Sequence, residues 1–313
     1  MQYLAIDVGG TTTKYGLVSA TGALSQQGEQ PTMRASLADF MASLTGLIRL
    51  HKAHVAGIGL ALPGVIDSQQ GLVKASATLP FLEGLVLGTQ LTTAADLTVP
   101  ILIENDGNAA ALAEHWRGNL AGTMNSAMVV LGTGVGASLF LNGQLYHGSH
   151  YVAGEPSFMV TNGLTPITRE QTAADLSAVA TINAMADALG VHEEPIGQRV
   201  FQALTDNTSE AAVILRTFTR GVAAMIYNMQ TILDLEKVII GGGISAQPRV
   251  IKEIRDGIEA YQQVTSLSAR TIRLPVVEPA KYRNAANLIG GGGAVGGARV
   301  VLNLSKNREK DTN

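Results

Sequence analysis

Three consecutive polar residues, Glu104–Asn105–Asp106, form the stretch best suited to chemistry. The apolar run Val99–Ile103 before them predicts a short buried strand, and Gly107–Glu114 after them predicts a helix opened by Asp or Asn. In an open α/β sheet, ligands bind where strands end and helices begin. A carboxylate at Asp106 could take a proton from a substrate hydroxyl there. The alternative is an Asp that only caps the helix, and the tripeptide alone favours that alternative.

A turn rich in Gly and Thr near the N-terminus could hold an anion. Tyr3–Val8 predicts a strand, Gly9–Thr13 a tight turn and Lys14–Val18 a returning strand. Such a tip offers backbone N–H groups and hydroxyls, and Asp7 could hold Mg²⁺ through water. An ordinary hairpin is the alternative. The turn is not a Walker A loop, because no G-x-x-x-x-G-K-[ST] occurs in the chain.

A second strand–turn–strand unit is expected from Ala127–Leu131, Gly132–Gly136 and Ala137–Leu141. Two such units in opposite halves of a chain suggest a phosphate chain clamped between two lobes. A further glycine cluster, Gly241–Gly243, follows the predicted strand Lys237–Ile240. Consecutive glycines at a strand end imply close backbone approach to something flat or anionic.

Other candidate binding residues lie in loops. Gly64 follows Pro63 in a turn, where its backbone could approach a ligand, although a plain turn explains it equally well. Glu155 lies in a polar loop and could hydrogen-bond a polyhydroxy ligand or simply be solvated. His147 and His150 are three residues apart, but no further ligand follows at suitable spacing, so no metal is expected there.

Helical and strand periods alternate along the chain, which predicts the α/β class. The pattern restarts after Arg117, so we place the first domain boundary near residue 118. Helices are expected over Leu37–Leu50, Leu87–Leu97, Thr172–Leu189, Ala211–Leu233, Val250–Tyr261 and Ala285–Leu304, and further strands over Val55–Leu62 and Arg273–Val277.

The composition restricts the function classes. The chain has 313 residues, 46% hydrophobic and 15% charged, with a net charge of −3, which gives no electrostatic case for a nucleic acid or membrane partner. The absence of cysteine excludes disulfides, a thiol nucleophile and cysteine-bound zinc. No signal peptide and no bilayer-spanning run are recognised, so a cytoplasmic protein is expected.

Taken in order, the motifs resemble those of a known superfamily. Asp7–Thr11, Leu131–Gly136 and Gly241–Gly243 look like the two phosphate motifs and the adenosine motif of the sugar kinase/actin/Hsp70 superfamily. The stretch Glu104–Asp106 and the run Ala153–Gly154–Glu155 resemble the ROK family of repressors, open reading frames and sugar kinases. The resemblance covers Leu4 to about Leu304.

The resemblance implies two ribonuclease-H-like (actin-like ATPase) lobes with ATP and sugar in a ligand cleft between them. The small lobe would comprise residues 1–117, completed by a C-terminal helix at about 294–313, and the large lobe residues 118–293. Asp106 would be the general base, Gly64, Asn105, Asp106 and Glu155 would bind the sugar, and a homodimer is expected. The ATP and Mg²⁺ residues would be Asp7 (Mg²⁺, indirectly), Gly9, Gly10, Thr11, Thr12, Lys14, Gly132, Thr133, Gly134, Gly136, Gly241, Gly242 and Gly243.

The chain departs from the family where many members bind structural zinc. Phe158 replaces a His that contacts both sugar and zinc, and the cysteine cluster is missing, so we expect no zinc. Glu170 and Asp175 are the candidates for a further sugar-binding carboxylate. The run from Phe158 through Gly190 looks most like zinc-free bacterial β-glucoside kinases.

The predicted function is therefore an ATP-dependent sugar kinase acting on the 6-hydroxyl of a hexose or hexoside. Glucose or a β-glucoside is favoured, and N-acetylmannosamine is possible. One alternative is a sugar-responsive transcription regulator of the same family, but the phosphate motif begins at Asp7 and leaves no room for a preceding winged helix. The other alternative is a non-catalytic sugar sensor, against which an intact Asp106 argues.

Overall fold

The computed structural model describes residues 1–161, 172–282 and 285–295. These residues divide into two compact units. Unit 1 contains Met1–Ala121 together with residues 285–295, and unit 2 contains Gly122–Tyr282. The segment 294–313, expected to complete the small lobe, lies outside the described residues except for its first two.

Unit 1 is built on a five-stranded sheet in the order β3-β2-β1-β4-β7. Its first three strands are antiparallel, whereas β4 and β7 run parallel to β1. The carboxyl ends of these three parallel strands therefore meet at one edge. The strands are β1 (Gln2–Val8), β2 (Thr12–Ser19), β3 (Leu24–Pro31), β4 (Ile58–Leu62) and β7 (Ile101–Asn105), with a separate pair β5 (Val65–Asp67) and β6 (Leu72–Ala75).

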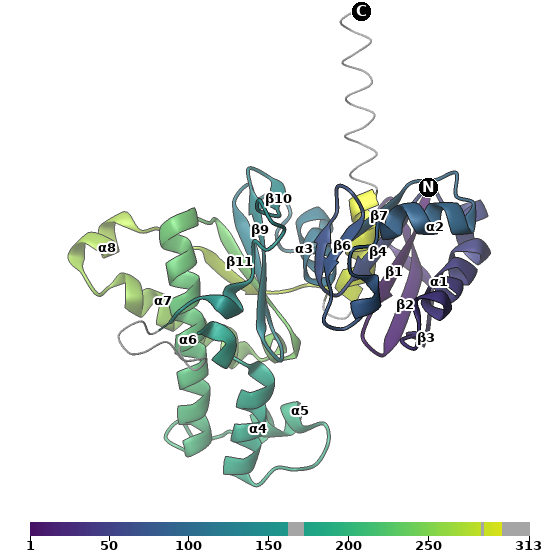
Figure 1. Ribbon diagram of the computed structural model, residues 1–313. Helices are drawn as coiled ribbons and strands as arrows, with labels where there is room; N and C mark the ends of the chain where they lie inside the picture. Colours follow the sequence, from purple (N-terminus) through teal and green to yellow (C-terminus); the bar gives the residue numbers. More distant parts are fainter. Residues whose placement is uncertain (162–171, 283–284, 296–313) are drawn as a thin grey trace, which may run out of the picture. The chain divides into compact units, whose positions relative to one another are not determined.

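Helices cover both faces of this sheet (Figure 1). On one face, Phe40 and Leu44 of α1 (Leu37–His51) and Leu91 of α2 (Leu87–Ala95) pack into an aliphatic core. The other face is covered by α3 (Asp106–Arg117) and by the helix at residues 286–295, drawn in yellow.

Unit 2 repeats the same plan, with a sheet in the order β10-β9-β8-β11-β12. Three antiparallel strands are again followed by two parallel ones. The elements are β8 (Ser126–Leu131), β9 (Val135–Leu141), β10 (Gln144–Tyr146), α4 (Ala178–Leu189), α5 (Ile196–Ala203), α6 (Glu210–Leu233), β11 (Lys237–Gly241), α7 (Pro248–Gln262), α8 (Ser266–Thr271) and β12 (Val276–Pro279). This architecture confirms the predicted α/β class, and the two predicted strand–turn–strand units occupy equivalent places in the two sheets, as β1–β2 and β8–β9.

Three predicted elements begin three or more residues later in the structure. The helix expected from Thr172 begins at Ala178, because Ser177 caps it and a 3₁₀ turn precedes it. The strand expected over 273–277 lies at β12, since pairing with β11 starts at Val276. The strand expected from Val55 begins at Ile58.

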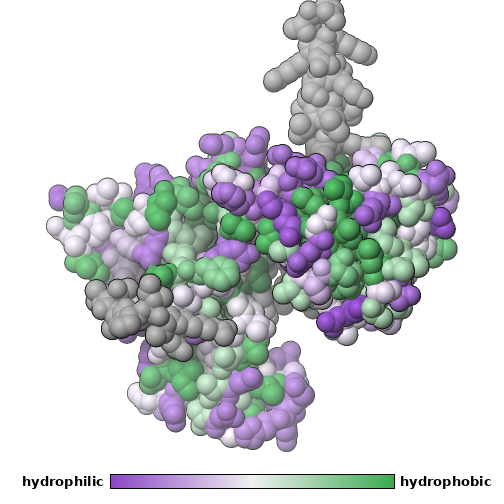
Figure 2. Space-filling model, viewed as in Figure 1, coloured by the Kyte–Doolittle hydropathy of each residue, from purple (hydrophilic) through white to green (hydrophobic). Residues whose placement is uncertain are grey.

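The surface has the mixed character of an ordinary globular protein. Figure 2 shows hydrophilic and hydrophobic residues interspersed over both units. Large hydrophobic side chains that are exposed, such as Leu50, Ile232 and Val264, lie on separate elements or loops. Scattered residues of this kind need no functional explanation. Within the described residues, no helix is long and apolar enough to cross a membrane.

Candidate active site

The junction of β7 and α3 places Asp106 at the carboxyl edge of the unit 1 sheet. Asn105, and not Asp106, is the N-cap of α3, because its Oδ1 accepts a hydrogen bond from the Asn108 N–H at 3.1 Å. The capping requirement that favoured a merely structural Asp106 is thus met by its neighbour. Asp106 is the first residue of the helix, where the helix dipole favours a negative charge.

One oxygen of the Asp106 carboxylate is held by the residues on either side of it. Oδ1 accepts from Asn105 Nδ2 at 3.1 Å and from the Gly107 N–H at 2.9 Å. Burial raises the pKa of Asp106 above its ordinary value, the Gly107 bond opposes this, and the nearby charge of Asp7 adds to it. A raised pKa moves a carboxylate toward the range in which it is an effective base.

The Asn105 side chain connects this junction to a second loop of unit 1. Its Nδ2 also donates to the Gly64 carbonyl at 3.0 Å, so both amide hydrogens and Oδ1 have protein partners. Gly64 has φ +123°, and an added Cβ would lie 2.2 Å from the Ala75 oxygen. A turn that only glycine can form therefore fixes the side chain of Asn105. The sugar-binding roles of Gly64 and Asn105 stay predictions.

Glu104 stabilises the same junction through hydrogen bonds. It is buried, and its Oε1 accepts from the Asn105 N–H at 2.8 Å and from Asn108 Nδ2 at 3.1 Å. The junction is therefore a local network of hydrogen bonds.

Asp7 is the next-to-last residue of β1, at the same sheet edge. In the strand register it lies opposite Lys14 on one side and Ala61 on the other, so these side chains share a face. Asn287 Nδ2, from the helix at residues 286–295, donates to Asp7 Oδ1 at 3.1 Å. Burial raises the pKa of Asp7, while the Asn287 hydrogen bond and the Lys14 charge lower it. Sequence reasoning missed Asn287.

Thr32, which the sequence did not indicate, holds the first Gly/Thr turn. Its Oγ1 donates to the Gly9 carbonyl at 2.8 Å, and its N–H donates to the Thr11 carbonyl at 2.9 Å. The Gly9 N–H in turn donates to the Thr12 carbonyl at 3.0 Å. The turn that contains Gly10 is thus a fixed hairpin tip next to Asp7.

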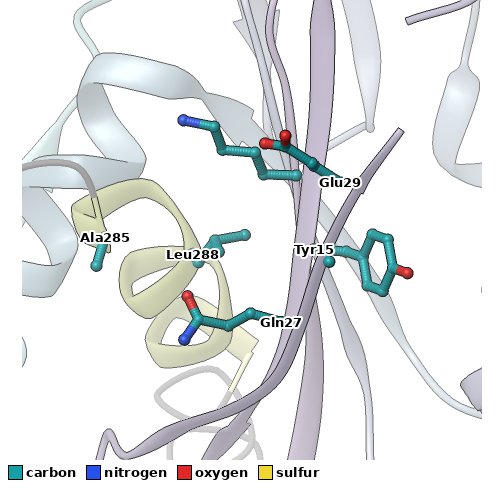
Figure 3. Close-up of a pocket in the computed structure, with 7 residues that line it drawn as sticks. Tyr15, Gln27, Glu29, Ala285 and Leu288 are labelled. Carbon is teal, nitrogen blue, oxygen red and sulfur yellow. The ribbon is translucent and has the colours of Figure 1, made fainter. Parts of the chain in front are cut away.

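A pocket of about 400 Å³ opens between β2, β3 and the helix at residues 286–295 (Figure 3). Lys14, Gln27 and Glu29 line its strand side and Leu288 its helix side, while Tyr15 points to the opposite face of the strand. Lys14 lies between Asp7 and Glu29 in the strand register. The predicted ATP-binding lysine is therefore on the Asp7 face of the sheet.

In unit 2, the second Gly/Thr turn lies beside the first residues of α4. The Gly132 carbonyl accepts from the N–H groups of Ala178 and Val179, and the Gly132 N–H donates to the Gly134 carbonyl at 3.0 Å. Ser157 Oγ donates to the Val135 carbonyl at 2.7 Å and accepts from the Val135 N–H. Ser157 was not predicted, and it connects the start of β9, which contains Gly136 and follows the turn at Thr133, to the loop of Glu155.

Gly241 ends β11, the parallel neighbour of β8, and Gly242 and Gly243 follow it. Gly242 has φ +87°, and an added Cβ would lie 2.0 Å from the Leu131 oxygen. Ser245 Oγ donates to the Gly242 carbonyl at 2.7 Å. The close approach expected of these glycines is therefore to the strand that leads into the second turn, and unit 2 brings these two motifs together.

The zinc-related positions have separate outcomes. Phe158 is 78% exposed, so its ring is not part of a core. Asp175 ends a 3₁₀ turn, and Glu170 lies outside the described residues. The described residues contain no group of three or more His, Cys, Asp or Glu side chains able to hold a metal. The absence of zinc stays a prediction.

The family model described as the ROK family matches residues 3–294. The chain belongs to the ROK family. It is 26% identical over 301 residues to a β-glucoside kinase of Listeria monocytogenes, covering 93% of this chain and 96% of the relative. It is 28% identical over 322 residues to a glucokinase of Halalkalibacterium halodurans, covering 93% of each.

A solved structure shows the same fold. A ROK family glucokinase from Streptomyces griseus, in complex with glucose and AMPPNP, superposes with a TM-score of 0.72 at 20% identity, covering 93% of this chain and 98% of that one. The predicted ribonuclease-H-like, actin-like ATPase fold class is thereby confirmed. Both of the relatives given above are named as sugar kinases, which supports a sugar kinase activity for this chain.

Proposed function

We propose that this ROK protein is an ATP-dependent kinase that phosphorylates the 6-hydroxyl of a hexose or hexoside, with glucose or a β-glucoside favoured. The observation that carries the proposal is the state of Asp106. It is a largely buried carboxylate with a raised pKa, held at a strand end without serving as the helix cap. That environment suits a general base better than a structural residue.

In the proposed reaction, Asp106 takes the proton of the sugar hydroxyl as its oxygen attacks the γ-phosphorus of ATP. An O–P bond forms, the bond from the γ-phosphorus to the bridging oxygen breaks, and ADP leaves with that electron pair. The Gly9–Thr12 turn and the Gly132–Gly136 turn would hold phosphates through backbone N–H groups. Glu155 would hydrogen-bond sugar hydroxyls.

The residues present fit a magnesium ion. Mg²⁺ commonly uses one or two carboxylates together with substrate phosphates and water, and Asp7 at the sheet edge supplies such a carboxylate. Asp7 would hold it indirectly, through water. When bound, the ion neutralises charge on the phosphates.

The size of the sugar is the finer part of the proposal. The relatives named β-glucoside kinase and the exposed Phe158 favour a site that admits a substituent at the anomeric carbon. An exposed ring offers an apolar face on which a sugar can stack. The segment expected to form the rest of this wall, Thr161–Thr172, lies outside the described residues except for its two end residues.

A coupled ADP-release assay tests the proposal on glucose, N-acetylmannosamine, cellobiose and gentiobiose. We expect turnover of glucose and of at least one β-glucoside, with phosphorus on O6 by NMR. Turnover of glucose alone would remove the β-glucoside part. If no sugar is turned over, the regulator and the sensor remain as the alternative functions. Light scattering on the same sample would test the expected homodimer.

A further inference from the structure

The helix at residues 286–295 lies unusually close to the sheet of unit 1. It contains four consecutive glycines, and an added Cβ at Gly290 would lie 1.6 Å from the Ala109 oxygen of α3. At Gly292 an added Cβ would lie 2.6 Å from Val18 Cβ of β2. Glycine is unfavourable in a helix interior, so four in a row indicate that close packing determines these positions. The helix is consequently fixed against both α3 and the sheet.

Asn287 is on the face of this helix that meets the sheet. It precedes Gly291 by four residues, which places both on one side of the helix. Gly291 lies near Ala5, and Ala5 and Asp7 point to the same face of β1. The hydrogen bond of 3.1 Å from Asn287 Nδ2 to Asp7 Oδ1 is therefore the product of the close packing.

A neutral amide suits this position better than a charged group would. The charged neighbour that acts on Asp7 is Lys14, opposite it on β2, and Asp7 in turn acts on Asp106, the first residue of α3. A second cation beside Asp7 would cancel the negative charge that a metal ion needs. A carboxylate in the same place would instead repel the carboxylate of Asp7. An amide N–H stabilises the ionised carboxylate without changing the net charge.

We propose that Asn287 is a positioning residue for the metal–nucleotide site: it fixes Oδ1 of Asp7 and so orients the carboxylate toward the hydrated cation of a magnesium–nucleotide complex. This inference rests on the proposed function only for the nucleotide. It assigns a role to a residue 280 positions away from Asp7 in the sequence.

The test is calorimetric binding of ADP to the full chain, once with excess Mg²⁺ and once with EDTA. The ratio of the two dissociation constants measures how much the cation contributes. We expect Asn287→Leu to reduce this ratio about fivefold to tenfold, which is in the range for the loss of one typical hydrogen bond, with less than about a twofold change in EDTA. If the leucine of Asn287→Leu prevents folding, Asn287→Ser takes its place in the experiment. The serine side chain is too short to reach Asp7, so we expect the same reduction of the ratio.

Ile289→Ala is the matched control. Ile289 is buried on the same helical turn, so its truncation weakens the helix packing but leaves the amide in place. We expect it to lower the melting temperature and to leave the ratio unchanged. Equal loss of the ratio in both variants, an unchanged ratio in Asn287→Leu, or a parent protein without any Mg²⁺ effect on ADP binding would overturn the inference. A parent that shows the Mg²⁺ effect but phosphorylates no sugar would contradict the proposed function alone.

Discussion

Asp106 and Asp7 are two carboxylates of one sheet edge that are held in opposite ways. The partners of Asp106 are Asn105 and Gly107, its immediate neighbours in the chain. The amide partner of Asp7 is Asn287, from the last described helix. Burial raises the pKa of both. The contrast teaches that a local sequence motif can organise the expected base, whereas the expected metal-site residue depends on the completed unit.

The largest effect should come from removing the expected base. We predict that Asp106→Asn lowers kcat by roughly a hundredfold to ten-thousandfold, because an amide cannot accept the hydroxyl proton. Steady-state kinetics on the best sugar measure this, and calorimetry should show that sugar and ATP still bind. A kcat close to that of the parent would reduce Asp106 to a structural residue.

Two neighbouring glycines, Gly290 and Gly291, test the close packing that brings the distant partner of Asp7 into place. We predict that Gly290→Ala destabilises the fold by about 1–3 kcal/mol or more, because its Cβ would overlap the Ala109 carbonyl of α3. Gly291→Ala is the control, since its Cβ would lie 3.5 Å from the nearest atom, in ordinary contact. Urea unfolding should show no loss for this control, and a gain of up to about 1 kcal/mol from helix propensity. Equal destabilisation by both would contradict the close-packing explanation.

A substitution at Asn105 tests the local hydrogen bonds that hold Asp106. We predict that Asn105→Ala costs about 0.5–2 kcal/mol of stability through the lost cap, and that it lowers kcat more than it raises the KM for sugar. The reason is that its amide already bonds Asp106, Gly64 and Asn108. Asn108→Ala, which loses only a side-chain bond to Glu104, is the control. A large rise in KM with kcat unchanged would instead indicate direct sugar binding by Asn105.

The smallest effect concerns the charge of Asp106. Its pKa in the folded state lies above the unfolded value, so the ionised carboxylate carries a penalty that is fully present above the folded pKa. This penalty disappears as the pH falls through the folded pKa toward the unfolded value. We therefore predict that Asp106→Asn is more stable than the parent at about pH 7.5 and that the difference shrinks toward about pH 4. Paired urea titrations at the two pH values check this, and a less stable variant at neutral pH would contradict it.

The same contrast explains how much could be predicted from the sequence. Asp7, the Gly/Thr turns and the stretch Glu104–Asp106 are local patterns of strand, turn and helix start, and the structure places these elements as expected. Asn287 could not be found in this way, because it acts through tertiary packing. Thr32 and Ser157 are likewise polar residues whose partners lie on another segment.

The predicted bounds of an element were wrong where a partner strand or a helix cap determines its end. The register with β11 sets the start of β12 at Val276, which no local pattern of Arg273–Val277 reveals. The start of α4 had a readable signal in Ser177, a favoured N-cap residue. Whether Asn105 or Asp106 caps α3 could not be predicted, because Asn and Asp are equally good N-caps and only the geometry distinguishes them.

The sequence order of the two units has a consequence for how the chain is synthesised. Unit 2 is one continuous stretch, but residues 285–295 of unit 1 follow it. Because ribosomes extend a chain from its N-terminus, all of unit 2 exists before Asn287 has been translated. A nascent chain that has only reached the end of unit 2 already carries Asp106 with its local partners, while Asp7 still lacks its amide partner. The proposed metal–nucleotide site is therefore completed only after all of unit 2 has been translated.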